Sequence, residues 1–170
     1  MIGVNIDFER GVIGMYRKVE DFLEDWMVSS AGTLNVMRAI TNDKLDQSIV
    51  EGHNSLGWLA WHLVGAAGAF GHFSGLQIPG PGREQAAPSD IEEIVAAYEK
   101  AIEAYKTEAG KLTDEALLEE VSGFAGPTER GKLLRALIDH QTHHRGQMTV
   151  LLRQAGLKVP GVLGPTKEMQ

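Results

Sequence analysis

Residues 139–156 read DHQTHHRGQMTVLLRQAG and hold three of the six histidines in this 170-residue chain. His140, His144 and Gln147 are spaced by four and three residues, so they lie on one stripe of a helix, which Leu151 continues. Apolar residues extend the same stripe backwards along the helix. This pattern indicates that the two histidines face the interior of a helical bundle.

Three other segments share this helical spacing, and turn-forming residues separate them. We expect helices over about residues 14–40, 55–75, 89–110 and 128–155, and a short helical piece at 113–121. The expected N-caps are Asn54 or Ser55, Ser89 in a capping box with Glu92, Thr113 and Thr128, and Gly156 ends the last helix. With no convincing alternating strand, the sequence predicts an all-α four-helix bundle with a short extra helix between the third and fourth.

The length and composition fit one soluble domain over residues 1–170, with a loosely ordered segment at 1–13 and a C-terminal tail at 157–170. The net charge of −7 argues against a nucleic-acid partner, because affinity for phosphates comes mostly from clustered Lys and Arg. Acidic residues interrupt the start of the chain and glycines and a histidine interrupt its longest apolar stretch, so we expect neither a signal peptide nor a membrane span. A cytoplasmic location is the expectation that remains.

The chain contains no cysteine, so any transition metal must be held by imidazole, carboxylate or water. Imidazoles four residues apart on a helix, such as His140 and His144, can chelate one ion. A third ligand must come from another helix, and the best candidate is His62 in LGWLAWHLVGAAGAF. Small residues on the His62 stripe, Ala66 and Ala69, would let a helix approach closely or leave a cavity.

Spacing alone leaves two questions open. His143 also falls on the side of the helix that faces His140, so the pattern does not separate it from His144. A polar surface stripe, or buried histidines with satisfied hydrogen bonds, would give the same spacing as a metal site.

The segments LGWLAWH (56–62) and DHQTHHRGQMTVLLRQAG (139–156) together resemble the DinB-like superfamily of four-helix bundle proteins, which includes YfiT-type metal-dependent enzymes. The resemblance runs from about Trp26 to the tail VPGVLGPTKEM, and its HxxxHRGQ element is the specific part. It implies that His62, His140 and His144 bind one divalent metal, most often nickel or zinc, and that His143 is a neighbour. It also implies a homodimer.

The resemblance implies a metal-dependent enzyme that acts on a small molecule. Three neutral imidazoles leave the ion at least one open coordination position, which suits catalysis better than a closed structural site. Relatives that use low-molecular-weight thiols suggest S-transferase-type chemistry, and hydrolysis is the other reaction considered. The alternative is a non-catalytic bundle, stapled by the metal or responsive to metal or stress.

Three further residues are assigned to the surroundings of the site. Gln147 lies one turn after His144 and either orients a ligand or water or makes a packing hydrogen bond. Trp58 and Arg145 are assigned to a substrate pocket, with core packing as the alternative for Trp58. The alternative for Arg145 is a salt bridge at the surface or between subunits.

Overall fold

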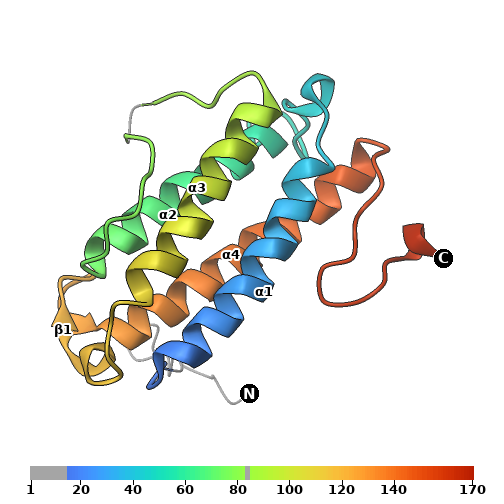
Figure 1. Ribbon diagram of the computed structural model, residues 1–170. Coiled ribbons are helices and arrows are strands. Elements are labelled where there is room, and N and C mark those ends of the chain that lie inside the picture. Colours follow the sequence, from blue (N-terminus) through green and yellow to red (C-terminus); the bar gives the residue numbers. More distant parts are fainter. Residues whose placement is uncertain (1–14, 83–84) are drawn as a thin grey trace, which may run out of the picture.

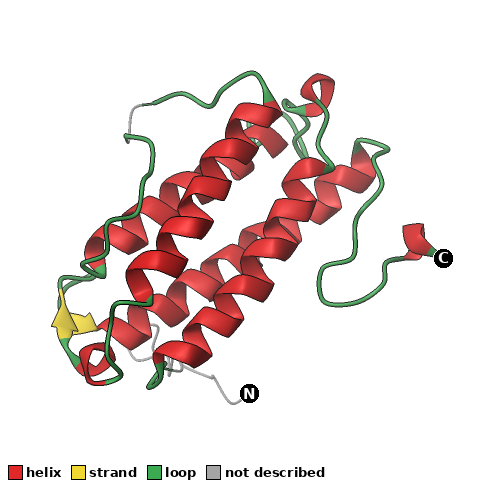
Figure 2. Ribbon diagram, in the orientation of Figure 1, coloured by secondary structure: helices red, strands yellow, loops and turns green. Residues whose placement is uncertain are grey.

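The computed structural model describes residues 15–82 and 85–170, and the segment expected to be loosely ordered, 1–13, lies outside these ranges. Four long helices lie side by side in it (Figures 1 and 2). They are α1 (Val19–Arg38), α2 (Leu56–Phe73), α3 (Ile91–Ala109) and α4 (Arg130–Gln154). Both α1 and α2 pack against α3 and α4. The predicted all-α four-helix bundle is confirmed.

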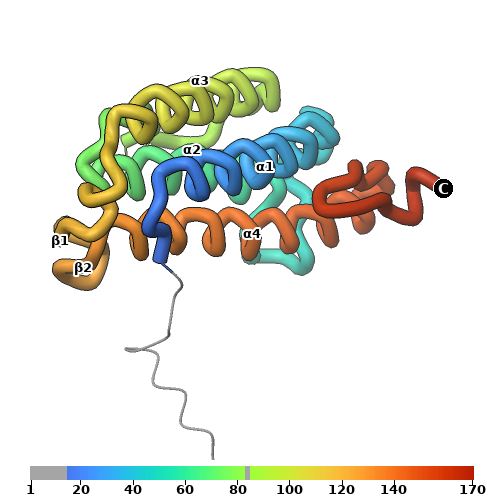
Figure 3. The backbone as a smooth tube through the Cα atoms, turned by 60° about the horizontal axis from the view of Figure 1, so that its bottom comes forward, coloured from blue at the N-terminus to red at the C-terminus, as the bar shows by residue number. Residues whose placement is uncertain are grey.

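Short elements lie between these helices and after the last of them. They are the 3₁₀ helices Asn42–Lys44, Glu115–Leu118 and Lys167–Met169, and the strands β1 (Glu120–Val121) and β2 (Thr128–Glu129). The extra helix expected at 113–121 is therefore only one 3₁₀ turn, and the chain then pairs β1 with β2 in antiparallel fashion. Figure 3 shows this ribbon at the end of the bundle where α4 begins. A two-residue strand has no alternation to read, so the sequence pattern could not predict it.

Some of the predicted helix ends are confirmed and other predictions are wrong. Ser55 is the N-cap of α2, and its hydroxyl accepts the Trp58 N–H at 3.2 Å, as predicted. Ser89 is not the cap of α3, because the Asp90 carboxylate takes that place and accepts the Glu92 N–H at 3.1 Å. A carboxylate is favoured there by the positive end of the helix dipole.

The starts of α4 and α1 depend on contacts that are distant in sequence. Thr128 was expected to cap α4, but it pairs with Val121 in the ribbon, and the helix begins only at Arg130. The helix α1 begins at Val19, whose N–H donates to the Asp114 carboxylate at 2.9 Å. At the other end of α4, Gly156 has a φ of 75°, a conformation that glycine adopts readily, so the predicted stop is confirmed.

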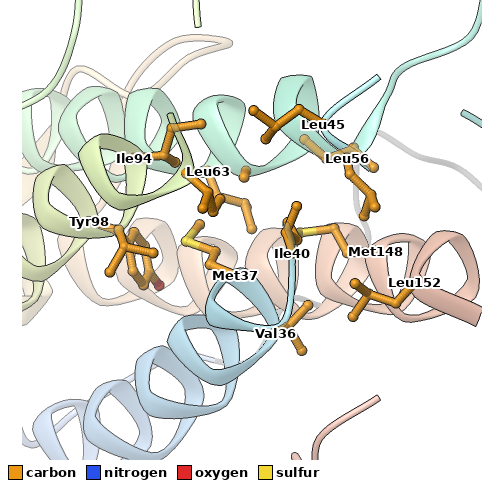
Figure 4. Packing of buried hydrophobic residues seen from close by; sticks show 14 of the residues in the cluster. Val36, Met37, Ile40, Leu45, Leu56, Leu63, Ile94, Tyr98, Met148 and Leu152 are labelled. Carbon is orange, nitrogen blue, oxygen red and sulfur yellow. The ribbon is translucent and has the colours of Figure 1, made fainter. Parts of the chain in front are cut away.

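Apolar side chains from all four helices fill the bundle in two clusters. One cluster includes Met37 from α1, Leu63 from α2, Tyr98 from α3 and Met148 from α4 (Figure 4). The second includes the aromatic rings of Phe22, Trp26 and Tyr105, and Trp26 is fully buried. Because both clusters join α2 to α4, the two helices are held together on either side of the candidate site. Within residues 15–82 and 85–170, no helix combines the length and the apolar character that crossing a membrane requires.

Candidate metal centre

Three histidines meet where α2 packs against α4. His62 comes from α2, and His140 and His144 come from successive turns of α4. One ring nitrogen of each lies within 4.8 Å of the others, and all three residues are half-buried. The structure therefore brings together the three residues that the sequence singled out. His143 is exposed and is not a member of this group.

The spacing of the ring nitrogens fits a single transition-metal ion. The Nε2 atoms of His62 and His140 are 3.3 Å apart. Two nitrogens bound to one tetrahedral ion at about 2.0–2.1 Å would lie about 3.3–3.4 Å apart. Little movement of these two rings is needed to bind an ion. His144 completes a set of three neutral nitrogen donors, which suits zinc, nickel, copper or iron better than the oxygen-seeking magnesium or calcium.

The imidazoles of His62 and His140 are held in the neutral form that binds metals. Burial, and after it the positive charge that the neighbouring His144, His62 and His143 would carry, together lower the pKa of His140 to about 4. Burial and the proximity of His144 also lower the pKa of His62. Near neutral pH both rings therefore present a lone pair without first having to lose a proton.

Gln147 fixes the orientation of one of these rings. Its Oε1 lies 2.8 Å from His144 Nδ1, and its Nε2 lies 3.3 Å from His143 Nε2. An amide oxygen can only accept a hydrogen bond, so His144 carries its proton on Nδ1 and leaves Nε2 free to bind an ion. Although Gln147 is exposed, it makes the contact that a metal-binding histidine usually has on its second nitrogen.

His140 has no such support among the described residues. Its Nδ1 is buried without a hydrogen-bond partner there, and the ring packs instead against Phe70, with centroids 5.6 Å apart. The adjacent Asp139 points elsewhere and pairs with Arg135 at 2.8 Å. This agrees with the sequence argument that consecutive helical residues point about 100° apart.

A large cavity opens beside the histidines along α2. Its volume is about 990 Å³, and both His62 and His140 contribute to its wall. Trp58 lies at its edge, 44% exposed, with its ring stacked on His62 at a centroid distance of 4.8 Å. Trp58 is therefore placed as a wall residue and not in the core. Ala66 and Ala69 face the same space, so their small size leaves a cavity.

Arg145 lies buried against α1 and not at the cavity, where a substrate-pocket residue would have to be. It is only 4% exposed, and its Nη1 donates to the Ser29 carbonyl at 2.7 Å and to the Thr33 hydroxyl at 3.2 Å, both on α1. It is absent from the described wall of the cavity and makes no ion pair among the described residues, so the surface salt bridge is not observed either. Being next to His144 on α4, it points away from the histidines.

Several residues of the site were not found from the sequence. Phe70 and Phe124 line the cavity, and their ring centroids are 4.7 Å apart. Phe124 comes from the turn between β1 and β2, an element that the sequence pattern did not predict. His72 also lines the cavity, although it is not one of the three clustered histidines.

The sequence also matches a known protein family. The model of the DinB family matches residues 15–170. The chain belongs to the DinB family. This confirms the resemblance stated from the two histidine-bearing segments. The family membership and the three-histidine cluster are together compatible with metal binding.

Three proteins from Bacillus species are similar to this DinB-family chain. Uncharacterized protein YrdA of Bacillus subtilis is 37% identical over 158 residues, which cover 91% of this chain and 93% of that protein. A crystal structure of a DinB-like protein from Bacillus cereus is 38% identical, with a TM-score of 0.79 over 87% of this chain and 99% of the other. A second, YjoA from Bacillus subtilis, is 19% identical with a TM-score of 0.67, covers 84% of this chain and 97% of its own, and supports the fold alone.

Proposed function

We propose that this protein binds one divalent transition metal, nickel or zinc, through His62, His140 and His144 and uses it as an enzyme acting on a small molecule. The observation that carries the proposal is that the three clustered histidines lie beside a large cavity, with His62 and His140 in its wall. A site that only joined two helices would not need to open onto such a space. The half-burial of the three side chains leaves one side of the group accessible.

The reaction types that fit best are thiol S-transfer and hydrolysis. A divalent ion held by three neutral ligands acts as a Lewis acid that polarises a carbonyl or lowers the pKa of a bound thiol or water. The chain supplies the rest: Gln147 fixes the His144 ring, and Trp58 covers one face of the His62 ring. The cavity wall positions the substrate and keeps water from its body. A homodimer forms part of the proposal, and light scattering on the purified chain tests it.

The alternative function is a non-catalytic metal staple between α2 and α4. What favours it is that the three ligands come from these two helices, so a bound ion would cross-link them. Against it, the two apolar clusters already join these helices on either side of the histidines. The two functions differ in whether the ion keeps a position that a small molecule can exchange into.

The test compares metal-loaded protein with its His62→Ala and His144→Ala variants in a panel of thiol-transfer and ester- or amide-hydrolysis assays. His53→Ala is the matched control, because His53 is exposed in the loop before α2. The proposal expects activity that both site variants lose and the control keeps. Activity that survives removal of the metal would overturn it. A metal that binds while no exogenous thiol or azide enters its coordination sphere would favour the staple.

A further inference from the structure

We infer that the cavity beside the histidines takes an uncharged, largely apolar small molecule, whose body lies along α2 and whose polar end reaches His62 and His140. This deepens the proposed function and rests on it only for the role of the polar end. The body of the ligand is inferred from the cavity wall alone.

The described part of the wall carries no side chain of fixed charge. Among the wall residues that the structure describes there is no Lys, Arg, Asp or Glu, and the ionisable side chains are three imidazoles, His62, His72 and His140. Burying a charge without a partner is costly, whereas an apolar group gains free energy when it leaves water. Thiols built from amino acids carry carboxylate and ammonium groups, so they match this wall poorly. An aromatic or aliphatic thiol, ester or amide matches it well.

The shape of the cavity suits an elongated body. On α2, the wall has small residues in the middle and aromatic residues at both ends. The small residues are Gly65, Ala66, Gly68 and Ala69. The aromatic residues are Trp58 and Trp61 at one end and Phe70 and Phe73 at the other. Phe73 lies fifteen residues after Trp58, which corresponds to about 22 Å at about 1.5 Å per residue. The volume of about 990 Å³ is at the upper end of the range for small-molecule sites, about 300–1,000 Å³.

Aromatic rings converge on the end of the cavity next to His140. Phe124 reaches across from the turn between β1 and β2, and its ring lies 4.7 Å from Phe70 and 4.5 Å from Phe73 between centroids. Phe124 is nevertheless 53% exposed, so a large apolar side chain is held at the rim and not in the core. Exposed aromatic residues at the edge of a concave apolar surface are typical of a ligand site.

The opposite wall is fixed against α2 by close backbone contact. A Cβ added to Gly68 would meet the Cα of Gly80 at 2.8 Å, and one added to Gly71 would meet the Ile78 side chain at 2.3 Å. The Trp61 Nε1–H also donates to the Gln85 carbonyl at 3.0 Å. These contacts come from the segment that connects α2 to α3. Because its residues 78–81 pack directly on α2, this part of the wall is formed before a ligand arrives.

The experiment uses two fluorescent probes that share one skeleton and differ in a single sulfonate. N-phenyl-1-naphthylamine is uncharged, and 8-anilinonaphthalene-1-sulfonate is anionic. Both are titrated into the full-length protein, metal-free and after zinc loading, and zinc binding is measured on the same samples by calorimetry. Ala69→Phe fills the cavity, and Ala31→Phe is the matched control because Ala31 is exposed on α1. Phe124→Ser gives a second test at the rim if Ala69→Phe does not fold.

The inference expects the uncharged probe to bind about tenfold or more tightly than the anionic one, with or without zinc. Ala69→Phe or Phe124→Ser then weakens the uncharged probe about tenfold, while Ala31→Phe leaves it unchanged. Equal affinity for the two probes, or binding that neither cavity variant alters, would overturn the inference even if zinc binds. If the probe results hold but zinc does not bind, the ligand class stands and the proposed metal function fails.

Discussion

The Nε2 atoms of His62 and His140 lie 3.3 Å apart across the interface of α2 and α4. At this distance the two nitrogens cannot both carry a proton, so His62 and His140 cannot both be positively charged. A divalent ion between them would accept the lone pairs of both nitrogens. Burial acts in the same direction, because it lowers the pKa of both rings.

The first prediction concerns the stability of the metal-free protein in acid. The folded-state pKa of His140 is about 4, below its ordinary value of 6.5. Between these two values the unfolded chain binds a proton that the folded chain does not, so stability falls as the pH drops through this window and is regained above it. Urea unfolding between about pH 4.5 and 7 measures this slope. His140→Leu should reduce the slope and His53→Leu should keep it, and an equal slope in both would contradict the assignment.

The second prediction is that Gln147 supports metal binding without touching the metal. Gln147→Leu removes the acceptor for His144 Nδ1, so we expect about a 10- to 100-fold loss of zinc affinity by calorimetry. Gln147→Glu keeps an acceptor at that position and should retain most of the affinity. Val150→Ala, at an exposed position on the same helix, is the control. If Gln147→Leu binds zinc as tightly as the wild type, the contact is only packing.

The third prediction separates Arg145 from the site. Arg145→Met removes the charged donor to the Ser29 carbonyl and the Thr33 hydroxyl, and a hydrogen bond to a charged group contributes about 1.5–3 kcal/mol of stability. Zinc affinity should stay within about threefold of the wild type, because the guanidinium faces α1. Denaturant unfolding and calorimetry on the same variant measure the two effects. If Arg145→Met had normal stability but no longer bound its ligand, Arg145 would belong to the substrate pocket after all.

The fourth prediction concerns removal of the metal. An ion that binds only the folded state stabilises it by about 2.7 kcal/mol when its concentration is 100 times the Kd, so chelation should lower the melting temperature. The helix content should not change, because the apolar clusters around Met37 and Trp26 hold the bundle together without metal. Circular dichroism before and after chelation checks this. Unfolding on chelation at 25 °C would mean that the metal is structural.

The fold was predictable because periodicity decides most of it. Helical spacing identified the four long helices, and local chemistry placed Ser55 at the start of α2 and Gly156 after α4. Two of the errors share one physical cause. Thr128 pairs with Val121 in a strand, and the Val19 N–H donates to Asp114, so each helix start depends on a residue outside the local pattern of that helix.

The site divides in the same way. Spacing on two helices selected His62 and His140 together with either His143 or His144, and the resemblance then separated His144 from His143. Spacing could not place Arg145, since one residue of shift turns a side chain from one neighbouring helix to another. Phe124 reaches the cavity through a turn with no regular pattern, so only the folded chain shows its role.

The most direct test of the metal site is elemental analysis of untagged protein that has never been in contact with a metal column. The wild type is measured beside His62→Ala, His144→Ala and the control His53→Ala. We expect about one nickel or zinc ion per chain in the wild type and the control, and loss of the ion in both site variants. A wild-type chain that contains no metal and takes up none on titration would contradict the central claim.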